Sequence, residues 1–83
     1  MNPRVLLQRV SRGAVQNVPF RDFLRLVLAF GFRLARVRGS HHILVHPGVP
    51  EPINLQEYDG EAKPYQIRQF LRLVLQYNLR LEA

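Results

Sequence analysis

The sequence predicts one α+β domain, with two helices on one face of a three-stranded antiparallel sheet and an N-terminal extension before it. Three observations lead to this prediction. The chain has 83 residues and 47% apolar content, which suits a single hydrophobic core. Residues 21–34 and 68–81 have similar helical patterns and share the hexapeptide FLRLVL. Short alternating segments bounded by Gly and Pro lie between them, as in a sheet.

Both predicted helices have recognisable first and last residues. Pro19 and Pro64 lie near their starts, where the missing N–H of proline costs no hydrogen bond. Gly31 and Asn78 follow them, and these residue types enter the left-handed conformation that ends many helices. We therefore expect each segment to contain a helix, a left-handed stop and the beginning of an extended stretch.

Each predicted helix has a polar stripe along one side, because its polar residues recur at helical spacing. The stripes contain Arg21, Asp22, Arg25 and Ala29 in the first helix, and Arg68, Gln69, Arg72 and Gln76 in the second. The apolar remainder is wide, so it needs cover on more than one side. We count Leu28 and Leu75 with the buried faces, and we expect Leu26 and Leu73 to remain available to a partner.

The first two strands form a predicted hairpin. Phe32–Arg38 and Ser40–His46 both read as extended segments, and they are joined at Gly39 by a turn. Because the connection is so short, the two strands must be antiparallel neighbours.

A third, shorter strand is predicted over Ile53–Gln56. Gly48 ends the preceding strand, and we expect Pro50 and Pro52 to keep strand pairing from resuming early, since proline has no N–H to donate. Residues Glu57–Lys63 are polar and contain a glycine, which predicts a loop before the last helix.

Residues 1–18 form the predicted extension, and residues 19–83 form the domain proper. Asn2 can cap a short helix whose first residue is Pro3, with a stop at Arg12-Gly13. A strand over Val5–Val10 is the alternative.

Composition narrows the classes of function. The chain has 12 Lys and Arg against 6 Asp and Glu, a net charge of +6, and nearly all the cations are arginines, which bind phosphate with a planar fork. This favours a nucleic-acid partner. There is no cysteine, which excludes disulfides and thiolate metal ligands. No apolar run approaches the roughly 18 residues of a membrane span, and Arg4 and Arg9 interrupt the N-terminal apolar stretch, so we expect a cytoplasmic protein without membrane contact.

Three histidines fall in the second predicted strand, at positions 41, 42 and 46. On a strand His42 and His46 lie about 13 Å apart, and His41 and His42 point to opposite faces, so we expect no metal site and no cofactor. His41 follows the hairpin corner near Arg36 and Arg38. A histidine among arginines is a candidate general base beside a phosphate, although a packing role is the alternative.

Several motifs along the chain together resemble one family. They are the run GF-x-L-x-R-x-R-GSHHI at residues 31–43, His46-Pro47 after it, and KPYQIR at residues 63–68. In this order they are similar to the HicA-type toxins of bacterial type II toxin–antitoxin pairs. The resemblance covers residues 19 to about 81.

The resemblance implies a fold, an activity and a partner. The fold would be that of a double-stranded-RNA-binding domain, α-β-β-β-α, and the activity would be a ribonuclease that cuts mRNA. The functional histidine of the family, which follows Gly-Ser, falls on His41. The partner would be a HicB-type antitoxin that covers this region. Ile43 and Val45 share the face of His41 and make it more apolar than is usual in the family.

The first hypothesis is a metal-independent endoribonuclease. His41 would take the proton of the ribose 2′-OH, which then attacks the adjacent phosphorus. We expect Arg36, Arg38 and Ser40 to hold that phosphate, and Lys63, at the start of the last helix, to form a second phosphate site. His46 lies about 17 Å along the strand on the opposite face and is a poor candidate for the general acid.

Two other hypotheses use the same domain. One is a non-catalytic RNA-binding module with the same basic surface. The other is a protein-interaction domain in which Leu26, Leu73, Ile43 and Val45 contact an antitoxin or a second copy of the chain.

Overall fold

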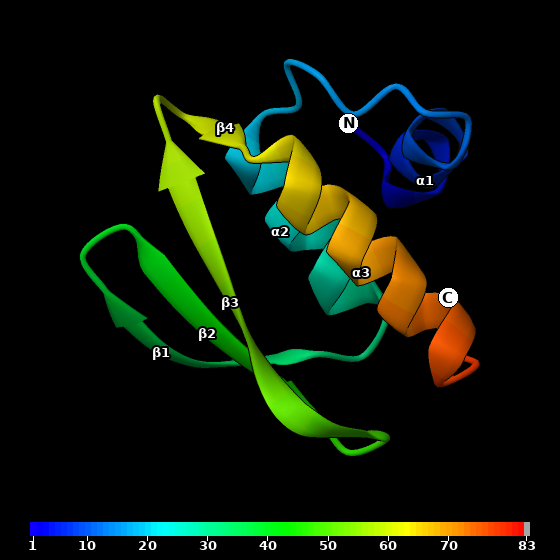
Figure 1. The fold of residues 1–83 in the computed structure, drawn as a ribbon, viewed down its shortest axis with the longest axis vertical. Coiled ribbons are helices and arrows are strands. Elements are labelled where there is room, and N and C mark those ends of the chain that lie inside the picture. The colour runs from blue at the N-terminus through cyan, green and yellow to red at the C-terminus, as the bar shows by residue number, and fades with distance from the viewer. Residues whose placement is uncertain (83) are drawn as a thin grey trace.

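The computed structural model describes residues 1–82, and within them the chain forms three helices and one four-stranded antiparallel sheet (Figure 1). In chain order the elements are α1 (Pro3–Ser11), α2 (Phe20–Ala29), β1 (Arg33–Arg38), β2 (His41–His46), β3 (Val49–Tyr58), β4 (Glu61–Ala62) and α3 (Pro64–Gln76). The strands are ordered β1-β2-β3-β4 in the sheet. Helices α2 and α3 lie on one side of the sheet, and α1 lies beside them, away from the strands (Figure 1).

The predicted helices and hairpin are confirmed. Gly31 follows α2 with φ 93° and Asn78 follows α3 with φ 52°, which are the expected left-handed stops. Strands β1 and β2 pair as a hairpin, with Arg38 opposite His41 at its closed end. The α+β class is therefore confirmed, whereas likeness to a double-stranded-RNA-binding domain stays a prediction.

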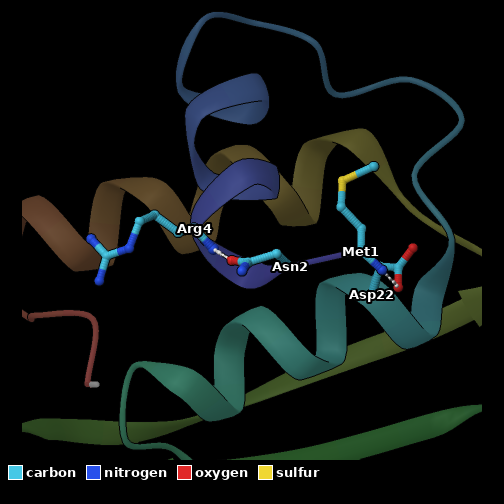
Figure 2. A network of polar contacts seen from close by, with 4 residues as sticks. All are labelled: Met1, Asn2, Arg4 and Asp22. Atoms are coloured by element: carbon cyan, nitrogen blue, oxygen red, sulfur yellow. Dashed lines mark hydrogen bonds and ion pairs between the residues drawn. The ribbon is translucent and has the colours of Figure 1, made fainter.

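The N-terminal segment is a helix, so the alternative strand over Val5–Val10 is wrong. The Asn2 side chain accepts a hydrogen bond from the Arg4 backbone N–H at 2.7 Å, which caps α1 as expected (Figure 2). The terminal ammonium of Met1 lies 3.1 Å from Asp22 Oδ1, which ties the beginning of α1 to α2 (Figure 2).

A third strand is present at the predicted residues Ile53–Gln56, but it is longer than expected, and the expectation that the prolines would delay strand pairing was wrong. Strand β3 has ten residues, from Val49 to Tyr58, and so contains both Pro50 and Pro52. The backbone N–H of Glu57 donates to the Ser40 carbonyl oxygen at 3.0 Å. In the regular part of the pairing, Ile53–Gln56, the even-numbered residues therefore direct their backbone groups toward the outer edge of β3. Both prolines lie between Val49 and Ile53, where the pairing of β3 with β2 is irregular, and proline is tolerated at such bulged positions of a sheet.

The predicted loop over residues 57–63 was also wrong. Strand β3 runs on to Tyr58, the chain turns at Asp59-Gly60, and Glu61–Ala62 pairs back as β4. The sequence pattern missed β4 because two residues are too few to show alternation.

The core lies between the helices and the sheet. The Phe70 ring of α3 contacts three other phenylalanines, Phe23, Phe30 and Phe32, with ring centroids 5.4–5.9 Å apart. Leu26 is fully buried and Leu28 is 40% exposed, so the expected roles of these two residues are reversed. Leu75, also predicted to be buried, is 83% exposed.

The reversal at Leu26 comes from α1, which supplies a second layer over α2. Positions 20, 23, 26, 27 and 30 are buried together, at the spacing of one wide helical face. Leu6 and Val10 of α1 belong to the same core cluster. The N-terminal extension is therefore part of the hydrophobic core and contributes to stability.

We predict that Leu6→Ala lowers the free energy of unfolding by about 2–5 kcal/mol, because it removes a buried side chain from this core. Val5→Ala is the matched control on the same helix, since Val5 is 41% exposed, and it should stay within about 0.5 kcal/mol of the parent. Urea denaturation followed by circular dichroism measures both. Equal effects of the two substitutions would contradict the packing of α1 described here.

Candidate functional site

The three histidines of β2 divide between the two faces of the sheet. The His42 ring lies 4.8 Å from the Phe20 ring of α2, and His46 Nε2 lies 3.1 Å from the Phe30 carbonyl oxygen at the other end of that helix. Leu44, between them, is fully buried. The even-numbered residues of β2 therefore face the helices, and the odd-numbered ones, His41 included, lie on the open face.

His46 has a structural role at the end of β2. The Gly48 N–H donates a hydrogen bond to His46 Nδ1 at 2.8 Å, so the ring hydrogen is on Nε2, which donates to the Phe30 carbonyl. Both ring nitrogens are thus engaged, and the ring packs on Phe32 at 4.9 Å. These contacts, beneath the helices, support the expectation that His46 is not an acid for chemistry at His41.

His41 is exposed on the open face and is oriented by Asn54 of the neighbouring strand. Its Nδ1 lies 3.1 Å from Asn54 Oδ1. Because a carbonyl oxygen only accepts, Nδ1 carries a hydrogen, so in the neutral form of the ring the lone pair is on Nε2. A neutral imidazole held in this form can take a proton from a molecule bound on the open face.

Arginines of β1 share this face. Arg38 lies directly opposite His41, and Arg36 lies opposite Ile43. Side chains at directly opposed positions project from the same face with Cβ atoms about 4.5–5.5 Å apart. All six residues of β1 are exposed, since it is an edge strand that reaches beyond the helices. The predicted neighbourhood of His41, Arg36 and Arg38 is therefore present as one basic surface.

Gln56 joins the two remaining predicted phosphate-binding residues to the same site. It lies opposite His41 in the sheet. Lys63 Nζ donates to Gln56 Oε1 at 2.6 Å, and Gln56 Nε2 donates to Ser40 Oγ at 3.3 Å. The ammonium of Lys63 also lies 6.0 Å from the centre of the Tyr58 ring. Ser40 and Lys63, far apart in sequence, are thus connected through Gln56 beside His41.

Sequence reasoning missed Asn54 and Gln56. Both lie within the short strand that was predicted, but only the register of β3 against β2 shows that they share the face of His41. Alternation within the strand placed them on one face together, and that was the only available signal.

A groove of about 540 Å³ lies between β3 and α3, and His41 forms part of its wall. Gln66 of α3, which is 7% exposed, connects the α3 wall of the groove to the β3 wall. Its Oε1 accepts from the Gln56 N–H at 3.0 Å, and its Nε2 donates to the Asn54 carbonyl oxygen at 3.2 Å. One amide side chain therefore occupies the outer edge of β3 at the level of the site.

The residues predicted for partner contact lie in three different places. Ile43 and Val45 are half-buried on the open face beside the arginines. Leu73 is half-buried and lines the groove. Leu26 is wholly inside the core, so it cannot contribute to a partner surface of the folded chain.

Within residues 1–82, no group of three His, Asp or Glu side chains is arranged to hold a metal ion. In the same part of the chain, no helix has the length and apolar character needed to cross a membrane.

The fold and the site define a small basic α+β domain with an exposed, oriented histidine on an open sheet face. A family model described as the HicA toxin of bacterial toxin–antitoxin systems matches residues 20–74, more than half of the chain. The chain belongs to the HicA toxin family, which confirms the resemblance seen in its motifs. It is the toxin component of a toxin–antitoxin pair, and an antitoxin is its partner. Comparisons with curated proteins and with solved structures gave no significant match.

Proposed function

We propose that this toxin is a metal-independent endoribonuclease that cleaves mRNA, with His41 as its general base. The observation that carries the proposal is the state of that ring: it is exposed, Asn54 holds its Nδ1 hydrogen, and its Nε2 is available. Family membership supports the activity, since HicA toxins in general cleave mRNA.

In the proposed reaction His41 Nε2 takes the proton of a ribose 2′-OH. The 2′-oxygen then forms a bond to the adjacent phosphorus, and the bond from phosphorus to the 5′-oxygen of the next nucleotide breaks. The products are a 2′,3′-cyclic phosphate and a 5′-hydroxyl, which takes up one proton. The RNA supplies its own nucleophile, so the residues of the site need to provide only a base and charge stabilisation.

Arg36, Arg38, Ser40 and Lys63 supply the phosphate contacts in this proposal. Within residues 1–82 the one ion pair lies between the Met1 terminus and Asp22, so no carboxylate neutralises the two arginines. Their guanidinium groups can therefore stabilise the negative charge that grows on the phosphate oxygens. Lys63 is hydrogen-bonded to Gln56 rather than paired with a carboxylate, so its ammonium can bind a second phosphate.

We predict that His41→Ala lowers the cleavage rate by about 10²-fold or more, because the proton acceptor is lost. The thermal unfolding midpoint and RNA affinity should change little, since this ring is exposed. Purified protein is assayed on labelled RNA in the presence of a chelator. His42→Gln, on the helix-facing side, should retain cleavage. Full activity of His41→Ala would remove His41 from the mechanism. If the parent protein bound RNA without cleaving it, the domain would instead be a non-catalytic RNA-binding module.

We predict that Arg38→Ala lowers RNA affinity and reduces the slope of log K against log salt by about 0.7, the contribution of one phosphate contact to single-stranded RNA. Arg12→Ala removes the same charge at the end of α1, a helix that lies away from the strands (Figure 1), and it should leave the slope unchanged. Fluorescence anisotropy titrations over a range of salt concentrations measure both. An equal change of slope in both variants would show that the open face has no special role.

We further propose that the partner is a HicB-type antitoxin and that it covers the open face. Ile43 and Val45 give this face an apolar strip beside its arginines. An apolar strip bordered by cations fits a protein surface that is partly apolar and acidic at its rim. Such a partner would exclude RNA from His41 without needing to change the fold of the toxin.

We predict that the double substitution Ile43→Thr and Val45→Thr weakens antitoxin binding by about tenfold, because two apolar contacts are lost while threonine keeps a high strand propensity. Leu34→Thr with Val37→Thr is the matched control, since these two exposed residues pair with Leu44 and His42 and so lie on the other face. Calorimetric titration with the antitoxin measures both. A loss of affinity confined to the control pair would place the interface on the helix side.

A further inference from the structure

The groove between β3 and α3 is not used by the chemistry proposed for His41. At about 540 Å³ it lies within the ~300–1,000 Å³ range of sites that take small organic groups. His41 forms part of its wall, so an occupant of the groove would lie next to the scissile phosphate.

The walls of the groove suit an uncharged, flat, polar group. Among residues 1–82, the walls contain no Lys or Arg and one carboxylate, Glu51, so a phosphate would meet no Lys or Arg side chain inside. The cations lie instead on the open sheet face, at Arg36 and Arg38. The groove offers an aromatic ring at Tyr65, which is 55% exposed, and the amide of Gln69. Aromatic rings stack on nucleobases, and amides form hydrogen bonds with base edges.

A peptide strand is a poor occupant of this groove. The outer backbone groups of β3 at Asn54 and Gln56 are already bonded to Gln66. At Pro50 and Pro52 there is no N–H to offer. An added strand would therefore find no continuous ladder of backbone partners along this edge.

We infer that the groove binds an unpaired base of single-stranded RNA, with Tyr65 as its stacking platform and Gln69 as a polar contact. The inference rests on the proposed function, which places the RNA backbone at His41. A series of hydrogen bonds connects the stacking platform Tyr65 to the proposed general base His41. Gln66 Nε2 donates to Tyr65 Oη at 3.4 Å and to the Asn54 carbonyl oxygen, and the Asn54 side chain bonds to His41. The bases of a duplex are stacked and paired and cannot enter such a groove, so the domain selects unpaired RNA.

The test compares binding of one 2′-O-methylated RNA of mixed sequence, as a single strand and as a duplex with its complement. Methylation removes the 2′-OH nucleophile, so binding is measured without cleavage. Tyr65→Ala should weaken single-strand binding by about tenfold, whereas Tyr65→Phe, which keeps the ring, should bind like the parent. Duplex binding should be the same for all three proteins.

A second pair of variants controls for charge. Gln69→Glu places a carboxylate in the groove and should weaken single-strand binding more than Gln8→Glu, which adds the same charge on the exposed surface of α1. The inference would be overturned if Tyr65→Ala bound the single strand as tightly as the parent protein does, or if its affinity fell equally for the single strand and the duplex. The two proposals remain separable: retained cleavage in His41→Ala would remove the proposed mechanism without altering these binding results.

Discussion

The alternation of side chains along β2 is the constraint on which the site depends. Three of its residues, His42, Leu44 and His46, are fixed beneath the helices by a ring contact, full burial and two hydrogen bonds. A shift of the strand by one residue would bring His41 under α2 and expose Leu44. The core packing that stabilises the domain therefore also keeps one imidazole on the open face, so the fold and the site cannot change independently.

The outer edge of β3 imposes a second constraint. An edge strand with free N–H and C=O groups invites pairing with another chain. Here Gln66 bonds to the edge at the level of the site, and prolines remove the donors further along. The same Gln66 holds α3 against β3, and so determines the width of the groove. A device that protects an edge strand from aggregation thus also shapes a surface beside His41.

The sequence predicted those parts of the fold that depend on local patterns. Helix stops at Gly31 and Asn78, the cap at Asn2 and the hairpin at Gly39 are each decided by a few neighbouring residues. Features that depend on tertiary contacts were not predictable in this way. Leu26 is buried because α1 folds over α2, and β3 contains two prolines where its pairing with β2 is irregular.

The same division holds for the candidate site. His41, Arg36 and Arg38 lie within one hairpin, so their proximity follows from a turn of known length. Ser40 and Lys63 were named individually, but the glutamine that joins them comes from a third strand whose register the sequence does not reveal. Asn54 was missed for the same reason, although it decides which nitrogen of His41 is free.

One open face serves both proposed interactions of this toxin, which explains its mixed composition. A surface made only for RNA would be basic and polar, whereas Ile43 and Val45 add apolar area directly beside the arginines of β1. Phosphates are attracted over the whole basic surface, but apolar area gains free energy only when another apolar surface covers it. In the proposed arrangement the strip favours a protein over RNA on the same face, so the antitoxin would exclude the substrate, and the groove behind β3 would contribute to RNA binding alone.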